Sequence, residues 1–465
     1  MPMYRFRRDP SHLNEIDWEK YHNTFLWRDN KTIIHMSESG EFFIVPQKRV
    51  SFYILRQDKE MLRCAVYGKT DAAIAETISF LWSLRAEVGG QHRQVNSLLI
   101  DFVVDFDVTV LTAEQLAQIL DSNPTREYYL AGGVWSTQQA VIMATRPYLL
   151  DLKLGGEPFA FEDDGAAFVD ALEKRQMPFG SLWITLNRNE RGFSRATMER
   201  LLKLKLEILE SINVTSRYEG RFLEPLTAKV KALEYIIDGR YYRPEDFESI
   251  EISAKDLNLT WYLDETGNYN GLLIFFLNRV AELGYLERLN LSTSRSQRAL
   301  DNEFPDMSEF PAITKALVDA IAGNQKLTHL NLQDTYFMCY YPPHLNFQDI
   351  FRVIENHGSL RSFTISRYPR ADPNYSWLKQ LLSRNRYITV FDSCGTRCSD
   401  GSSVDQIYAL NYFFCGSAEL MKVSPSLRPT LLATALMESA SEKYQYAALL
   451  LSDHTDVLCE CLQEY

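Results

Sequence analysis

The residues that could carry chemistry are few, and the most suggestive cysteine pair, Cys394 and Cys398, lies in "DSCGTRCSDGSS". Structural metal sites use such a pair together with a second pair, or with histidines, at ligand spacing. The other close pair, Cys459 and Cys461, lies far along the chain. We therefore interpret Cys394 and Cys398 as small core or turn residues. A metal- or thiol-dependent enzyme centred on these two residues is the alternative hypothesis.

The other candidates for catalysis have structural explanations. The carboxylates of "FEDDG", which ends at Gly165, precede the helical pattern "AAFVDALEKR" and are expected to cap that helix at its positive end. The eight histidines are scattered, and His357 stands at a predicted helix end. No phosphate-binding loop, G-x-G-x-x-G, G-x-S-x-G or H-E-x-x-H motif occurs. We predict a protein that is not an enzyme, with no catalytic residues, no metal and no cofactor.

The composition restricts the partners and the compartment. The 61 acidic and 49 basic residues give a net charge of -12, which repels a phosphate backbone, so we expect no nucleic-acid partner. The N-terminus lacks the apolar run of a secretory signal, and no segment reaches the ~20 apolar residues of a membrane span. Seven cysteines, an odd number spread along the chain, fit a reducing compartment. We expect a cytoplasmic monomer with no membrane partner.

One short apolar pattern, L-x-x-L-x-L, recurs along the chain. Clear copies are "LLDLKL", "LERLNL" and "LTHLNL", which begin at Leu149, Leu286 and Leu327. Degenerate copies begin at Val95, Phe179, Leu209, Phe247 and Leu360. Alternation with period two predicts short strands with one buried face. The copies follow one another at steps of about 30 residues, which is enough for one strand and one helix.

The segments between these strands carry helix signals. "LTAEQLAQIL" and "STQQAVIMA" each begin with a capping box, formed by Thr112 with Gln115 and by Ser136 with Gln139. Later helical patterns end on glycine, where we expect the left-handed conformation that ends a helix. These glycines are Gly284, Gly323 and Gly358. A single helix and strand cannot bury their apolar faces alone, so stacked repeats in a curved solenoid are predicted.

The pattern resembles the leucine-rich-repeat family, and specifically its ribonuclease-inhibitor-like class with a helix in each repeat. The resemblance rests on "LTHLNL", "LERLNL" and the helix-length spacers, and it covers about residues 60 to 395. "AKDLNL", "LLSRNRYITVFD" and "ALLLSDHTDVLCE" also look similar to uncharacterised leucine-rich-repeat families of diatoms and related algae, which imply no activity. The resemblance implies an α/β horseshoe with a parallel sheet on its concave face and helices on its convex face.

Three regions are predicted along the chain. Residues 1–60 alternate apolar and polar positions and form a β-rich N-terminal cap, and residues 61–398 form the leucine-rich-repeat solenoid. Residues 399–465 contain helical patterns and form a helical C-terminal cap over the last apolar layer. Between residues 215 and 285, "VKALEYIID" and "FESIEIS" compete for the strand register.

The predicted function is non-catalytic binding of a protein partner on the concave surface. In each strand, the residue between the last two apolar positions points away from the core. The resulting row is Leu99, Tyr129, Lys153, Trp183, Asn213, Glu251, Asn290, Asn331 and Thr364. Trp183 with Tyr129 and Lys153 is the kind of aromatic and cationic cluster that anchors protein interfaces. The alternative for this face is a solvated sheet in which Trp183 only packs on its neighbours.

Two further hypotheses remain open. The protein is alternatively a receptor subunit of a larger assembly, which recruits machinery through its caps. The aromatic loop "DTYFMCYYPPHLNF" is either a contact site or packs against the neighbouring repeat. The aromatic residues ahead of its two prolines are Tyr336, Phe337, Tyr340 and Tyr341.

Overall fold

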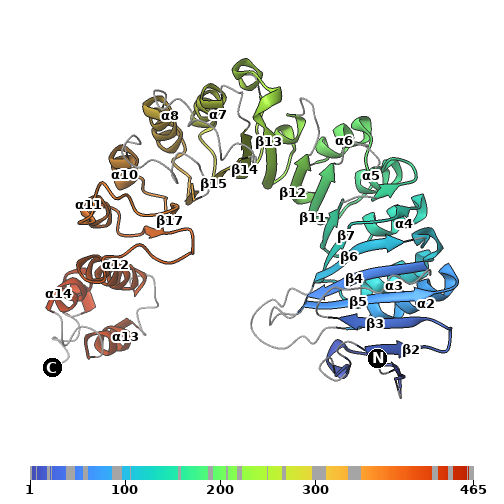
Figure 1. Cartoon of the computed structure of the whole chain (residues 1–465). Coiled ribbons are helices and arrows are strands. Elements are labelled where there is room, and N and C mark those ends of the chain that lie inside the picture. The colour runs from blue at the N-terminus through green and yellow to red at the C-terminus, as the bar shows by residue number, and fades with distance from the viewer. Residues whose placement is uncertain are drawn as a thin grey trace. The chain divides into compact units, whose positions relative to one another are not determined.

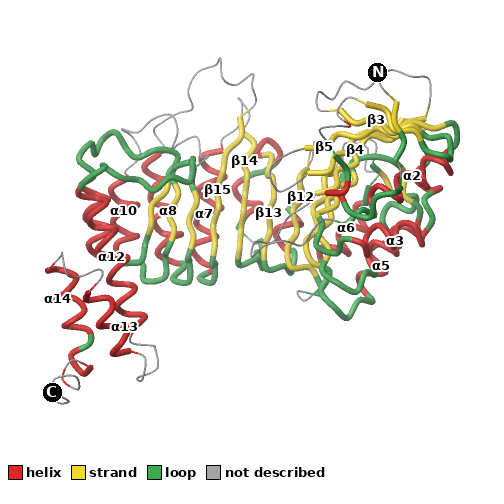
Figure 2. The backbone as a smooth tube through the Cα atoms, turned by 90° about the horizontal axis from the view of Figure 1, so that it is seen from below, coloured by secondary structure: helices red, strands yellow, loops and turns green. Residues whose placement is uncertain are grey.

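The computed structural model describes residues 3–6, 8–17, 21, 24–37, 48–55, 61–85, 97–104, 106–155, 159–186, 192–205, 208–216, 223–248, 250–263, 269–295, 310–333, 347–420, 428–437, 444–457 and 459. The chain divides into two compact units, Met1–Ile237 with Ile250–Lys255 and Asp238–Ser249 with Asp256–Tyr465. Each unit is a mixed α/β structure in which helices lie along one face of an open sheet (Figure 1; Figure 2). Val95 and most of the aromatic loop, residues 334–346, lie outside the described residues.

The sheet of the first unit changes from antiparallel to parallel along its length. Its antiparallel neighbours are, in order, β2 (Thr24–Trp27), β3 (Ile33–Ser37), β5 (Met61–Gly68), β4 (Lys48–Leu55) and β6 (Ser97–Val104). The short β1 (Met3–Tyr4) pairs in parallel with β2. A parallel run then continues from β6 through β7 (Glu127–Leu130), β9 (Leu150–Leu154), β11 (Gly180–Leu186), β12 (Leu209–Ser216) and β13 (Ala232–Asp238).

Helices alternate with the strands of the first unit, and each packs against the next. They are α2 (Asp71–Trp82), α3 (Ala113–Ser122), α4 (Thr137–Ala144), α5 (Ala166–Glu173) and α6 (Arg195–Leu202). Three 3-10 turns and a two-stranded parallel ribbon complete the unit: η1 (Leu13–Glu15), η2 (Val108–Val110), η3 (Glu224–Thr227), β8 (Val134–Trp135) and β10 (Ala160–Phe161).

The predicted helix caps of the first unit are confirmed. Both capping boxes are complete, because Thr112 and Gln115 at α3 exchange side-chain to backbone hydrogen bonds, and Ser136 and Gln139 do the same at α4. In the acidic run, the Asp163 carboxylate accepts hydrogen bonds from two N–H groups at the start of α5, the closer at 2.6 Å. This carboxylate therefore caps α5, as the sequence indicated.

The second unit repeats the same alternation with shorter strands. Its parallel strands are β14 (Asp256–Leu263), β15 (Arg288–Arg295), β16 (His329–Asn331), β17 (Ser362–Thr364) and β18 (Thr389–Phe391). Its helices α7 (Tyr269–Leu283), α8 (Phe310–Gly323), α10 (Phe347–Glu355) and α11 (Ser376–Arg384) pack side by side in this order. The unit begins with the 3-10 turns η4 (Gly239–Tyr241) and η5 (Pro244–Phe247).

After β18, the regular elements of the described residues are all helices. α12 (Ser403–Leu420) packs against α11, and both α13 (Arg428–Ala435) and α14 (Tyr444–Asp453) pack against α12. Leu432, Leu450 and Val457 form a small core between them, where Phe413 stacks on Tyr446 at 4.3 Å between ring centroids. The predicted change from strands to helices near residue 399 is thus present in the described residues.

Most of the predicted core positions are buried, but two predictions of register were wrong. The leucines of "LERLNL" and "LTHLNL" are all buried. In "LLDLKL", Leu149 is 43% exposed and Leu150 is buried, because β9 begins at Leu150 and alternates strictly from there. In "FESIEIS", Phe247, Ile250 and Ile252 are buried without forming a strand.

An aromatic cluster determines which segments after residue 215 form strands. Pro244 begins a 3-10 turn that places Phe247 against Trp261 and Phe276, at 5.6 and 6.2 Å between ring centroids. The chain therefore forms its strands on either side of this turn, in "ALEYIID" as β13 and in "DLNLTWYL" as β14. Tertiary packing of Phe247 outweighs the local alternation that predicted a strand there.

The three predicted helix-ending glycines have different roles. Gly284 follows α7 with φ of 70°, the left-handed conformation that the sequence indicated. Gly323 and Gly358 have no positive φ, so the prediction was wrong for both. At Gly323, a Cβ would collide with the carbonyl oxygen of Ala281 and lie 3.0 Å from its carbonyl carbon. Gly323 thus allows α8 to approach α7 closely, whereas a Cβ at Gly358 would meet nothing within 4 Å.

Polar side chains join the ends of several helices to the neighbouring repeat. The last carbonyls of a helix have no partner within the helix, and they need donors from elsewhere. In the first unit, buried Arg126 donates to the carbonyls of Trp82 and Leu84 at the end of α2, and Arg175 donates to Ala144 at the end of α4. We call these side chains, together with their equivalents in the second unit, the helix-end latches.

The second unit uses smaller side chains for the same purpose. The Asn324 amide donates to the carbonyls of Val280 and Ala320, both at 2.8 Å. The latches of the second unit are Asn324, His357, Asn385 and Asn411, each of which reaches a carbonyl of the preceding repeat. All four are buried, so the interfaces from α7 to α12 contain satisfied polar contacts as well as apolar packing.

Candidate functional site

The candidate site is the sheet face opposite the helices, which we call the outer face. In the first unit, backbone pairing runs from Leu99 to Tyr129, Lys153, Trp183 and Asn213 on neighbouring strands, as the predicted row requires. The residues that flank each of the last four in its own strand are buried. The side chains of these four residues therefore point away from the core; those of Tyr129, Lys153 and Trp183 are half-buried, and that of Asn213 is buried.

Lys153 is held between an acidic and an aromatic neighbour. Its ammonium lies 4.3 Å from the centroid of the Trp183 ring and forms an ion pair with the carboxylate of Glu127. Such half-exposed cation–π and ion-pair contacts are each worth at most about 1 kcal/mol. Their effect here is to fix the orientation of the Trp183 ring before any partner arrives, so that little side-chain entropy is lost on binding.

Between β7 and β13, next to the row of the first unit, the outer face is acidic. Asp151 pairs in register with Glu127, and Glu234 pairs in register with Asn213 at the end of the row. Against the single ammonium of Lys153, the carboxylates of Glu127, Asp151 and Glu234 leave two negative charges (three minus one). The aromatic part of the row is thus flanked by uncompensated carboxylates.

One predicted residue of the row is misplaced. Glu251 belongs to no strand and is exposed, because the "FESIEIS" segment follows the η5 turn instead of pairing in a sheet. Sequence reasoning missed Glu234, which occupies the position of the row in β13, and Asn258, which occupies it in β14. Strict alternation in "ALEYIID" and in "DLNLTWYL" was the signal that could have found both residues.

The second unit has a row of its own on the outer face. Asn258 pairs in register with Asn290, Asn290 with Asn331, and Asn331 with Thr364, and the row then continues to Phe391. In the adjacent position of the same strands, the hydroxyls of Thr260 and Ser292 lie 2.6 Å apart. This row is neutral and polar, unlike the acidic and aromatic row of the first unit.

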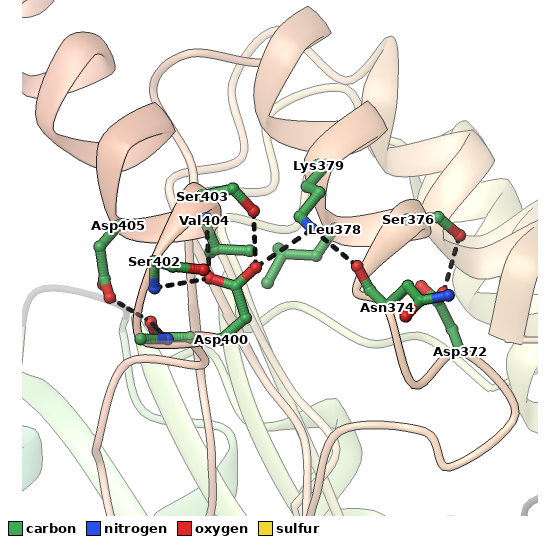
Figure 3. A network of polar contacts seen from close by, with 12 residues as sticks. Asp372, Asn374, Ser376, Leu378, Lys379, Asp400, Ser402, Ser403, Val404 and Asp405 are labelled. Atoms are coloured by element: carbon green, nitrogen blue, oxygen red, sulfur yellow. Dashed lines mark hydrogen bonds and ion pairs between the residues drawn. The ribbon is translucent and has the colours of Figure 1, made fainter.

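The cysteine turn is organised around helix caps. Figure 3 shows Asp400 next to Ser402, Ser403 and Val404, whose N–H or O–H groups donate to its carboxylate. Lys379 of α11 pairs with the same carboxylate at 3.1 Å. These hydrogen bonds, above all the one from the Ser403 hydroxyl, lower the pKa of Asp400. Asp400 therefore caps α12 as an anion and ties it to α11.

The two cysteines of this turn have different environments. Cys394 is exposed, whereas Cys398 is buried, and burial raises the pKa of the Cys398 thiol to about 12. A thiol with such a pKa stays protonated and is a poor nucleophile and metal ligand. Within the described part of the chain, no three His, Cys, Asp or Glu side chains come together as a set that could hold a metal ion.

A serine, an aspartate and a histidine meet between α12 and α14, which the sequence did not indicate. The Ser417 hydroxyl donates to Asp453 at 2.9 Å, and His454 Nε2 donates to the backbone carbonyl of Ser417 at 3.1 Å. A nucleophilic serine needs the imidazole as acceptor of its proton, with the carboxylate behind the imidazole. Here the Ser417 hydroxyl donates its proton to the Asp453 carboxylate instead of to the imidazole, and both Ser417 and His454 are buried. The cluster is therefore a contact between helices.

Comparison with known proteins adds no assignment. No protein-family model matches the chain, and no curated protein matches it in sequence. Among the helices of the described residues, none is both long enough and apolar enough to cross a bilayer.

Proposed function

We propose that the chain is a non-catalytic binding protein built from leucine-rich-repeat-like solenoid units of the ribonuclease-inhibitor-like class. Support comes from the parallel alternation of strand and helix within each unit, with each helix stacked on the next. The helix-end latches support the same proposal, because they make each repeat depend on its neighbour. The helices α12–α14 then act as the C-terminal cap, with Asn411 as the last latch.

The proposed binding surface is the outer face of the first unit, around Tyr129, Lys153 and Trp183. The observation that carries this proposal is the in-register row, in which Trp183 is excluded from the core and oriented by Lys153. Aromatic side chains at the centre of a patch are the usual anchors of protein interfaces. Because carboxylates flank this patch, the partner is expected to present a basic segment with apolar side chains. On the second unit, Asn290, Asn331 and Thr364 form a separate proposed contact row of neutral hydrogen-bonding groups.

The proposal is tested with the partner recovered by affinity purification of the full chain. We expect Trp183→Ala with Tyr129→Ala to weaken binding of that partner by about 2 kcal/mol or more, measured by calorimetry, with little change in melting temperature. The matched control is Val141→Ala with Met177→Ala, which removes two exposed apolar side chains on the helical side of the same unit. If both double variants bind the partner with equal affinity, the partner binds elsewhere on the chain. If Trp183→Ala with Tyr129→Ala unfolds the protein, these two side chains belong to the core.

A second candidate function is recruitment through the C-terminal helices, as in a receptor subunit of a larger assembly. It is favoured by the unusual exposure of Tyr412 and Tyr444, at 85% and 81%. Tyr412→Ser with Tyr444→Ser should abolish association with a larger assembly in size-exclusion chromatography of cell extract, without affecting the partner of the outer face. We do not propose thiol or metal chemistry at Cys394 and Cys398, because Cys398 is buried with a raised pKa.

A further inference from the structure

Two arginines near the end of the second unit stack on aromatic rings that also contact each other. The Cζ atom of Arg361 lies 4.8 Å from the ring centroid of Tyr387, and that of Arg386 lies 4.3 Å from the ring centroid of Phe414. The rings of Tyr387 and Phe414 meet edge to face at 6.3 Å. We call this continuous set of four side chains the arginine–aromatic stack.

The stack is held by rigid parts of the fold. One nitrogen of Arg361 donates to the carbonyls of Gly358 and Leu360, at 2.7 and 3.2 Å. The Tyr387 N–H donates to the side chain of Asn385, the buried latch that fixes this turn to the end of α10. The guanidinium of Arg361 and the turn that carries Arg386 and Tyr387 are therefore held before a ligand binds, which reduces the entropy lost on binding.

The charges of the stack are not compensated. Arg361 and Arg386 form no ion pair with any carboxylate among the described residues, and both are exposed. By contrast, three neighbouring arginines are paired: Arg352 with Asp349, Arg384 with Glu355, and Arg397 with Asp405. Two adjacent uncompensated cations are therefore exposed in a chain whose net charge is -12.

We infer that the arginine–aromatic stack docks an acidic linear segment of a protein partner. An aromatic ring covers the flat face of each guanidinium, so carboxylates can reach only its N–H edges, whose fork geometry suits them. At Arg361 this leaves the nitrogens other than Nη1, which donates to the backbone. Tyr387 is 46% exposed and offers an apolar surface beside these edges. A nucleic acid fits less well, because its binding needs a continuous basic groove and the chain as a whole is acidic. This surface is distinct from the row of the first unit and does not depend on the function proposed for that row.

The inference is tested by fluorescence anisotropy of the full chain with a labelled peptide of alternating glutamate and glycine. We expect saturable binding that weakens with salt, and that falls by about tenfold or more in Arg361→Gln with Arg386→Gln. The control, Arg352→Gln with Lys315→Gln, removes the same charge from the helical side of this unit and should change affinity less than about twofold. An absence of binding by the unaltered chain, or an equal loss in the control, would overturn the inference.

The role of the ring is tested separately at Tyr387. Tyr387→Phe keeps the face on which Arg361 stacks and should bind the glutamate peptide like the unaltered chain. Tyr387→Leu removes this face and should weaken binding severalfold without lowering the melting temperature. A single-stranded oligonucleotide serves as the competing probe. If the oligonucleotide binds more tightly than the glutamate peptide, and if Arg361→Gln with Arg386→Gln abolishes its binding, the stack does not dock an acidic protein segment and the inference is wrong.

Discussion

The helix-end latches make a quantitative prediction at Asn324. This buried amide donates to the carbonyls of Val280 and Ala320, and its oxygen accepts from the N–H of Leu286 at 3.1 Å. It therefore satisfies three backbone groups that belong to α7, α8 and the start of the next strand. Asn324→Leu keeps a side chain of similar size but removes all three hydrogen bonds.

The expected loss follows from these contacts. A buried hydrogen bond contributes about 1 kcal/mol net, and a backbone group left without a partner adds a desolvation cost. Three bonds give about 3 kcal/mol, and the orphaned carbonyls raise the expected loss to about 3–5 kcal/mol. With a urea dependence of about 2–3 kcal/mol per molar, the midpoint for the second unit should fall by about 1–2 M.

The matched control is the neighbouring Gln325. Its amide donates to the carbonyl of Ala322 but is exposed, so water replaces that bond in Gln325→Leu and the loss should stay below about 0.5 kcal/mol. Because two units need not unfold together, urea unfolding is combined with hydrogen exchange of the Leu286 amide as a local measure. If Asn324→Leu and Gln325→Leu have the same midpoint and the same exchange rate at Leu286, the latches do not stabilise the repeat interfaces.

Three further predictions concern single residues. Gly323→Ala should destabilise the second unit by about 1–3 kcal/mol, because the new Cβ collides with the backbone of Ala281. Gly358→Ala is the control and should not destabilise it, because a Cβ there meets nothing. An equal loss of stability in Gly358→Ala would show that the collision with Ala281 is not the cause. Hydrogen bonds depress the folded-state pKa of Asp400 below its unfolded value of about 3.9, so its stabilisation of α12 is present above that pH and lost as pH falls through the folded pKa. The protection of the Val404 amide, measured against its intrinsic exchange rate at each pH, should therefore fall in acid, and Asp400→Asn should reduce this pH dependence. An unchanged acid response would exclude Asp400 as its source. Peptide mapping after brief alkylation should find Cys394 modified and Cys398 protected, and rapid modification of Cys398 in the folded chain would contradict its burial.

The sequence by itself determined the local features of this protein. The capping boxes at Thr112 and Ser136 were predictable because each involves groups only three residues apart. The in-register positions of Tyr129, Lys153, Trp183 and Asn213 were predictable because period-two alternation has one buried face, and parallel neighbours repeat it. The change to helices after residue 399 followed from the same kind of local periodicity.

Only the tertiary structure decided the features that join distant residues. Apolar alternation in "FESIEIS" predicted a strand at Glu251, but packing of Phe247 on Trp261 and Phe276 prevents one there. Gly323 owes its role to Ala281 of the preceding helix, and Asn324 satisfies carbonyls up to 44 residues away. Arg361 stacks on Tyr387 of the following repeat. No pattern within a single repeat specifies such contacts, because their free energy depends on which surfaces the folded chain brings together.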